Sequence, residues 1–113
     1  MKKSKNSHSI DELLKIMDEL RVKCPWDKEQ TIDSLKTLTV EETFELVDAI
    51  NSGDYDEIKN ELGDLLLHII FYSKIADEKQ IFNFNDVVES ISKKLIHRHL
   101  MSIKLKNNYL KKK

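Results

Sequence analysis

The sequence predicts an all-α domain in which four to five helices pack as a bundle. Of its 113 residues, 40% are hydrophobic and 35% are charged, a balance typical of helices with one buried and one solvated face. Only two Gly and one Pro are present, so few of the sharp turns that join short strands are available. The length fits one domain, and because so small a core is limited, we expect oligomerisation to stabilise it.

The first helix is predicted from Ser9 to about Lys23. Ser9 is followed three residues later by Glu12, which is a capping-box pattern, and apolar residues then recur at helical spacing. We expect residues 24–27 to form a loop, because Pro25 disfavours helix in the residue before it. Residues 1–8 are expected to be a flexible N-terminus, with the helical domain over 9–100.

The second and third helices are predicted on either side of Gly53. Residues 31–38 are expected to form a short helical turn, after which Thr39 caps the second helix, with Glu42 at the matching third position. Gly53 ends this helix, and Asp54 caps the third one, which continues to about residue 78.

The centre of the third helix, residues 65–71, is apolar nearly all round. Such a helix needs cover on several sides, so we expect a homodimer or a higher homo-oligomer. Residues 81–85 are predicted as a loop that buries two aromatic side chains, and the fourth helix as starting near Asn85 or Asp86. Residues 101–113 form a basic C-terminal tail.

The charge and cysteine content narrow the class of protein. A net charge of −1, from 19 basic and 20 acidic residues, gives no indication of a nucleic-acid polymer or a membrane surface as partner. The single cysteine, Cys24, rules out an internal disulfide and agrees with a reducing cytoplasm. No apolar run reaches the roughly 18 residues of a membrane span, and no apolar stretch follows the basic start, so we expect no signal peptide.

Carboxylates gather on the second and third helices. Glu41, Glu42, Glu45 and Asp48 fall within an arc of roughly 120° on the second helix, at about 100° per residue. Glu61 and Asp64 are three residues apart on the third. If antiparallel packing brings these faces together, four to six carboxylates converge.

Uncompensated, these carboxylates would repel one another and their pKa values would rise. A divalent cation resolves the conflict, and all-oxygen ligation selects Mg²⁺, with Mn²⁺ as a substitute. The alternative is a solvated acidic face, with Glu42 serving only as a capping residue. A di-iron site fits less well because its Glu-x-x-His pairs are missing. His68 follows Asp64 by four residues, and we interpret it as an ordinary hydrogen-bonded core histidine.

Four motifs occur in a characteristic order. They are CPWDKEQT at residues 24–31, EETFE at 41–45, ELGDLL at 61–66 and KLIHRH at 94–99. This order resembles the MazG family of all-α nucleoside triphosphate pyrophosphohydrolases over about residues 10–99. The resemblance implies a helical fold that dimerises and cleaves nucleoside triphosphates between the α- and β-phosphates with Mg²⁺, as nucleotide-pool house-cleaning.

The resemblance also implies roles for particular residues. Glu42, Glu45, Glu61 and Asp64 would be the metal ligands. Glu41 would be a further ligand or would orient the attacking water. Lys94 and Arg98, four apart on one helical face, match positions that meet the phosphates. The substrate-binding candidates in the loop are Trp26, which could stack on a base or anchor the loop, and Lys28. Asn85 could contact the nucleotide, and we favour a capping role for it.

The sequence departs from the family pattern after His99. Family members continue there with a proline and a histidine, whereas this chain continues with Leu100 and Met101. Many members carry two copies of the domain, and this chain resembles the N-terminal copy, as a natural short form or one truncated by an altered reading frame. The alternatives to an active enzyme are a dimerisation or regulatory module with weak hydrolysis, and a helical protein that binds nucleotides or an alarmone without cleaving them.

Overall fold

The computed structural model describes residues 8–111 and contains five helices and no strand within that range. They are α1 (Ile10–Lys23), α2 (Pro25–Glu29), α3 (Ile32–Ser52), α4 (Tyr55–Glu78) and α5 (Phe84–Lys111). The all-α class and the four-to-five-helix count are thereby confirmed. The predictions for residues 1–7 and 112–113 lie outside the described residues.

Three of the predicted helix ends are confirmed. The Ser9 hydroxyl accepts a hydrogen bond from the Glu12 amide at the start of α1. Gly53 adopts the left-handed conformation, with φ of 75°, that ends α3, and glycine reaches it without steric cost. The Asp54 carboxylate then caps α4 by accepting from two backbone amides.

Two predicted boundaries before the carboxylates are wrong. Residues 25–29 form helix α2 instead of a loop, because Pro25 occupies the first helical position, where its missing N–H costs nothing. Thr39 does not cap a helix, since α3 already begins at Ile32 under a reciprocal capping box of Thr31 and Ser34. Glu42 is therefore not a capping residue either, because it lies in the interior of α3.

The start of α5 also differs from the prediction. Asn83 and Asp86 exchange side-chain-to-backbone hydrogen bonds, so α5 begins at Phe84, and Asn83 takes the capping position that we predicted for Asn85. Phe84 packs against the core, whereas Phe82 remains 39% exposed, so only one of the two aromatics is packed inside. The helix then passes residue 100 without a break.

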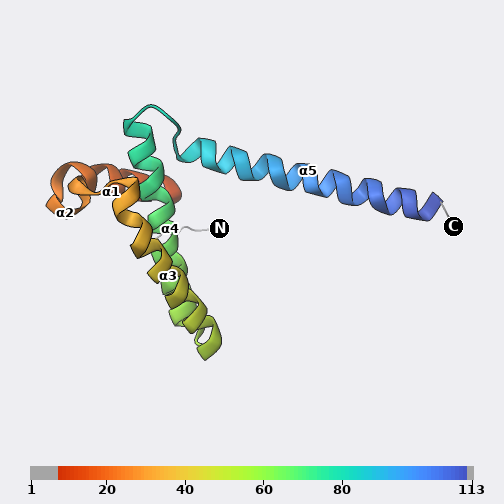
Figure 1. Ribbon diagram of the computed structural model, residues 1–113, viewed down its shortest axis with the longest axis horizontal. Coiled ribbons are helices and arrows are strands. Elements are labelled where there is room, and N and C mark those ends of the chain that lie inside the picture. The colour runs from red at the N-terminus through yellow and green to blue at the C-terminus, as the bar shows by residue number, and fades with distance from the viewer. Residues whose placement is uncertain (1–7, 112–113) are drawn as a thin grey trace.

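The core lies where α1 and the first half of α3 meet the second half of α4 (Figure 1). Its buried side chains are Met17, Leu35, Ile70, Phe71 and Ile75. Below it, α3 and α4 continue as an antiparallel two-helix arm, in which Ala49 is buried. This arm carries the predicted carboxylates.

Helix α5 projects away from the other helices and closely approaches only α4 (Figure 1). The radius of gyration of 18.8 Å reflects this, since a compact chain of this length has about 13 Å. No helix within residues 8–111 combines the length and the apolar character needed to cross a bilayer.

Candidate functional site

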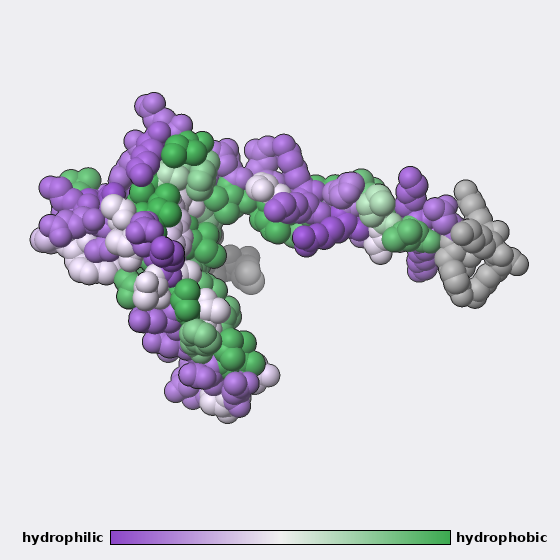
Figure 2. Space-filling model, viewed as in Figure 1, coloured by the Kyte–Doolittle hydropathy of each residue, from purple (hydrophilic) through white to green (hydrophobic). Residues whose placement is uncertain are grey.

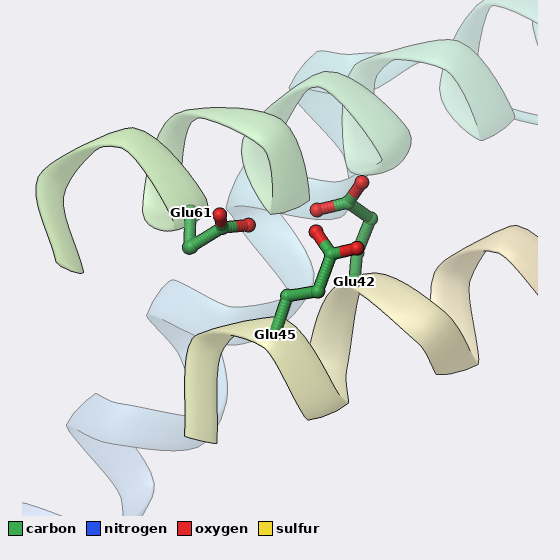
Figure 3. A group of neighbouring side chains, drawn as sticks. All are labelled: Glu42, Glu45 and Glu61. Carbon is green, nitrogen blue, oxygen red and sulfur yellow. The ribbon is translucent and has the colours of Figure 1, made fainter. Parts of the chain in front are cut away.

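Three carboxylates meet between the two helices of the arm. Glu42 and Glu45 lie one turn apart on α3, and Glu61 faces them from α4 (Figure 3). One carboxylate oxygen from each lies within 4.8 Å of the others. The i, i+3 spacing puts Glu42 and Glu45 on the same face, and the antiparallel turn at Gly53 brings Glu61 opposite them. The predicted convergence is therefore present for these three residues.

The cluster is electrostatically uncompensated. Oε2 of Glu42 and Oε2 of Glu61 are buried and have no hydrogen-bond partner among the described residues. Partial burial, followed by the proximity of Glu42 and Glu45, raises the pKa of Glu61 to about 7. Burial and then the charges of Glu45 and Asp64 raise the pKa of Glu42, although the contact with Glu61 partly offsets this. Such a cluster is unfavourable unless a proton or a cation joins it.

The donor set fits a hard divalent cation. Buried carboxylate oxygens without partners are costly, and a cation that accepts them as ligands removes the cost. The three groups supply only oxygen, which suits Mg²⁺ or Mn²⁺ more than Zn²⁺ or iron. The arm can therefore hold such an ion between α3 and α4.

Three of the six predicted acids lie outside the cluster, and Asp48 is an exposed member of this group. Asp64 is exposed, one turn beyond Glu61 on α4, and its charge acts on both Glu42 and His68. Glu41 precedes Glu42 but is exposed and is not one of the three clustered carboxylates. Asp64 is thus near enough to join a ligand set, whereas Glu41 lies at the periphery of the site.

A hydroxyl network fastens α3 to α4 next to the carboxylates. The Thr39 hydroxyl donates to the Leu35 carbonyl at 3.1 Å, contacts His68 Nδ1 at 2.7 Å and is hydrogen-bonded to the Tyr72 hydroxyl. The hydroxyl has a single proton, which it donates to Leu35. It therefore accepts hydrogen bonds from the Tyr72 hydroxyl and from the N–H at Nδ1 of His68. Burial lowers the pKa of His68, with Asp64 acting in the opposite sense. His68 is hydrogen-bonded, as we predicted, but it is half-buried beside the site and is not part of the core.

Thr39 and Tyr72 were missed by the sequence interpretation, which assigned Thr39 to a helix cap. One signal could have found them. Thr39 lies three residues before Glu42, and Tyr72 follows His68 by four, so each residue shares a helical face with a neighbour in or beside the site.

The predicted phosphate-binding pair lies elsewhere in the chain. Lys94 and Arg98 are exposed on α5, which runs away from the arm (Figure 1). Lys94 lines a shallow apolar pocket with residues of the preceding loop and of α5, such as Phe82 and Ile91. Within one copy, the structure does not bring these two cations to the carboxylates.

The substrate-binding candidates of the predicted loop lie on α2. The Trp26 ring meets Phe71 of α4 edge to face, with 6.3 Å between ring centroids, and is 53% exposed. The indole is therefore anchored on α4, as one of the two predicted roles requires, and stacking on a base stays a prediction. Lys28 is exposed.

Comparison with known proteins shows the family to which this chain belongs. The family of the MazG nucleotide pyrophosphohydrolase domain matches residues 30–101, which is more than half of the chain and includes all of α3 and α4. The chain belongs to the MazG family. A MazG-related protein of Thermotoga maritima has a similar fold, with a TM-score of 0.69 at 24% identity over 79% of this chain and 78% of that one.

Curated relatives of this MazG chain are longer. A nucleoside triphosphate pyrophosphohydrolase of Escherichia coli K12 is 48% identical over 95 residues, which are 81% of this chain and 36% of that protein. The nucleoside triphosphate pyrophosphohydrolase/pyrophosphatase MazG of Thermotoga maritima is 44% identical over 92 residues, 80% of this chain and 36% of that protein. The chain thus spans about a third of the length of these relatives.

Proposed function

We propose that this chain hydrolyses nucleoside triphosphates to the monophosphate and pyrophosphate, with Mg²⁺ held by Glu42, Glu45, Glu61 and Asp64. The observation that carries the proposal is the pair of buried, unpartnered oxygens that Glu42 and Glu61 contribute to one point between α3 and α4, within the part of the chain that the structure describes. The family membership supports it, as do the names of the longer relatives. A cytoplasmic location for this house-cleaning activity fits the single free Cys24.

The side chains of the site would have separate roles in the proposed reaction. A divalent cation bound here would polarise the phosphate oxygens and lower the pKa of a coordinated water. Glu42, Glu45 and Glu61 would hold that cation through their carboxylates, and the exposed Asp64 would be the fourth ligand. Glu41 is a further candidate for orienting the attacking water. The exposed face of Trp26 offers a stacking surface for the base, and Lys28 a nearby charge.

We further propose that a second copy supplies Lys94 and Arg98 to the phosphates, in a homodimer or a higher homo-oligomer. Apolar side chains are exposed on the arm and along α5 (Figure 2), including Phe44, Val47, Ile50, Leu62, Ile91, Leu95, Ile96 and Leu100. Residues 90–111 contain no acid, whereas acids crowd residues 41–64. Both the apolar faces and the opposite charges favour pairing α5 of one copy with the arm of another.

The direct test is product identity. Purified protein is incubated with each ribo- and deoxyribonucleoside triphosphate, with Mg²⁺ or with a chelator, and the products are separated by ion-exchange chromatography. Monophosphate and pyrophosphate in equal amounts, only with the metal, support the proposal. Diphosphate and phosphate would contradict the bond that we assign. No turnover, with a melting temperature raised by Mg²⁺ and nucleotide together, would favour a binding or regulatory module instead.

A further inference from the structure

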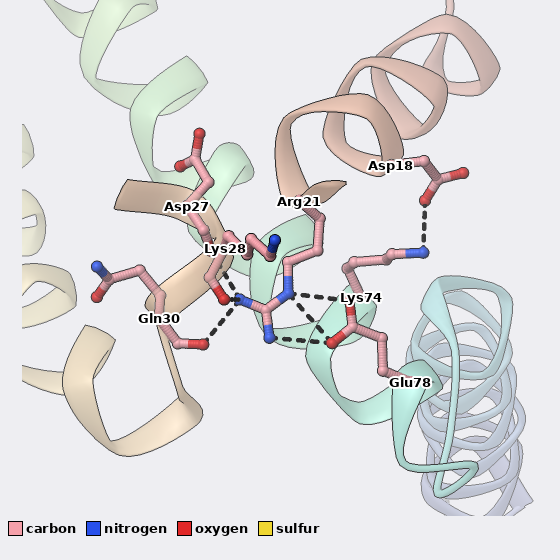
Figure 4. Close-up of polar contacts among 7 residues, drawn as sticks. All are labelled: Asp18, Arg21, Asp27, Lys28, Gln30, Lys74 and Glu78. Atoms are coloured by element: carbon pink, nitrogen blue, oxygen red, sulfur yellow. Dashed lines mark hydrogen bonds and ion pairs between the residues drawn. The ribbon is translucent and has the colours of Figure 1, made fainter. Parts of the chain in front are cut away.

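The side chain of Arg21, near the end of α1, joins three helices (Figure 4). Its Nη1 donates to the carbonyl oxygens of Asp27, Lys28 and Gln30 at 2.6, 3.0 and 2.8 Å. Its Nε and Nη2 donate to the carboxylate of Glu78 at the end of α4, at 2.9 to 3.1 Å. The Arg21 side chain is 13% exposed and that of Glu78 is 35% exposed, so the guanidinium is largely shielded from solvent while the carboxylate is partly accessible.

Helix α2 depends on this contact. It has five residues, too few to be stable in isolation, and at its end the Asp27 carbonyl accepts only a long backbone hydrogen bond of 3.4 Å from the Gln30 amide. Arg21 satisfies this carbonyl, and the fork shape of the guanidinium lets the same group pair with Glu78. Gln30 adds a second restraint on α2, because its side-chain Nε2 donates to the Trp26 carbonyl oxygen at 2.9 Å.

The consequence for the proposed site follows from the position of Trp26. Its ring rests on Phe71, which follows Asp64 by seven residues on α4. Seven residues are two helical turns, so Phe71 lies about 10 Å further along nearly the same face. The orientation of α2 therefore sets where the exposed part of Trp26 lies relative to the carboxylates.

We propose that Arg21, fixed by Glu78, is a positioning residue that holds α2 so that Trp26 can receive the nucleobase while the carboxylates act on the phosphates. The inference rests on the proposed function, because it concerns the base-binding part of the same site. The hydrogen bonds of Arg21 go to Glu78 and to the backbone of residues 27, 28 and 30, and not to the carboxylates of the arm, so we expect its effect on base recognition and not on the chemical step.

The test uses the intact chain and two readouts. Trp26 is the only tryptophan, so its fluorescence reports on α2 alone. In Arg21→Met we expect stronger quenching by acrylamide, and loss of the emission change that ATP, GTP, CTP or UTP causes. We expect KM for these nucleotides to rise about tenfold with kcat little changed, as for loss of one base–aromatic contact. Competition by inorganic tripolyphosphate, which has no base, should be unchanged.

Two further variants keep the inference falsifiable. Lys74→Met removes the 3.0 Å ion pair with Asp18, which also ties α1 to α4 but does not touch α2, and it should leave KM and fluorescence as in the wild type. Glu78→Gln should reproduce the Arg21→Met changes in weaker form. This variant covers the case in which Arg21→Met fails to fold.

The outcomes separate the inference from the proposed function. If the wild type turns over but the Arg21 and Glu78 variants keep wild-type KM and fluorescence response, the inference is wrong and the function stands. If Arg21→Met weakened tripolyphosphate competition as much as nucleotide binding, or if Lys74→Met had the same effects as Arg21→Met, the cause would be general destabilisation. Either result would also overturn the inference. If the wild type shows a Trp26 response to nucleotides without turnover, hydrolysis fails and the inference is still decided by the variants. If it shows neither, both are wrong.

Discussion

Glu42 on α3 and Glu61 on α4 each bury a carboxylate oxygen that has no hydrogen-bond partner among the described residues, and their side chains face one another across the arm (Figure 3). Two like charges in this arrangement destabilise the helix pair unless a proton or a cation lies with them. The stability of the arm should therefore depend on both pH and divalent metal.

The first prediction concerns pH without metal. The pKa of Glu61 is about 7 in the folded chain, against an ordinary value of 4.5 for the unfolded one, so between these values the folded state holds more protons. The free energy of unfolding should therefore fall as pH rises from about 4.5 through 7. The depressed pKa of His68 acts in the opposite direction, so the measurement is the difference between the wild type and Glu61→Gln.

Melting temperatures in the presence of a chelator, from pH 5 to 8, check this. Glu61→Gln should gain stability relative to the wild type as pH increases, and saturating Mg²⁺ should remove most of the difference. A difference that does not change with pH would show that Glu61 is already compensated in the folded state.

The second prediction concerns turnover. Glu45→Gln and Asp64→Asn should each lower kcat/KM by at least about 100-fold, since each removes a charged metal ligand from the proposed set. Both side chains are exposed, so the far-ultraviolet circular dichroism and melting temperature should change little. Retention of activity by both folded variants would defeat the ligand assignment.

The third prediction concerns the second copy. If Lys94 and Arg98 act on the carboxylates of a partner, a hybrid of Glu45→Gln and Arg98→Ala chains contains one intact site. Co-expression in equal amounts should then restore about a quarter of wild-type activity, because half of the dimers are hybrids with one working site of two. Either variant alone should be inactive. A mixture as inactive as its parents would place all these residues in one copy.

The fourth prediction concerns the network at Thr39. Thr39→Val should lower the free energy of unfolding by about 1–3 kcal/mol, because it leaves the polar groups of His68 and Tyr72 without their common partner. Tyr72→Phe, which removes one contact and leaves the other, should cost less. Urea denaturation measures both, and a Thr39→Val variant as stable as the wild type would show that water replaces the hydroxyl.

Local patterns predicted the features that depend on local geometry. Gly53 and Asp54 were identifiable because a left-handed C-cap and an N-cap each favour few residue types. Glu42, Glu45 and Glu61 were identifiable because helical spacing fixes which side chains share a face.

The remaining features depend on competition between possible capping residues, or on contacts between residues that are distant in the sequence. Thr39 and Thr31 both match a capping pattern in the sequence. Thr31 is the N-cap because α3 continues through residue 39 without a break. Arg21 is one basic residue in a last turn, and its partners include Glu78, 57 residues away. The direction of α5 follows from a few contacts with α4, which no periodicity encodes.

The most direct measurement of the central claim is binding of Mn²⁺, followed by electron paramagnetic resonance, to the wild type and to Glu61→Gln. We predict Mn²⁺ binding by the wild type that Mg²⁺ displaces, and affinity at least about tenfold weaker in Glu61→Gln, as for the loss of a ligand. Equal Mn²⁺ affinity in the two proteins would contradict a metal centre between α3 and α4.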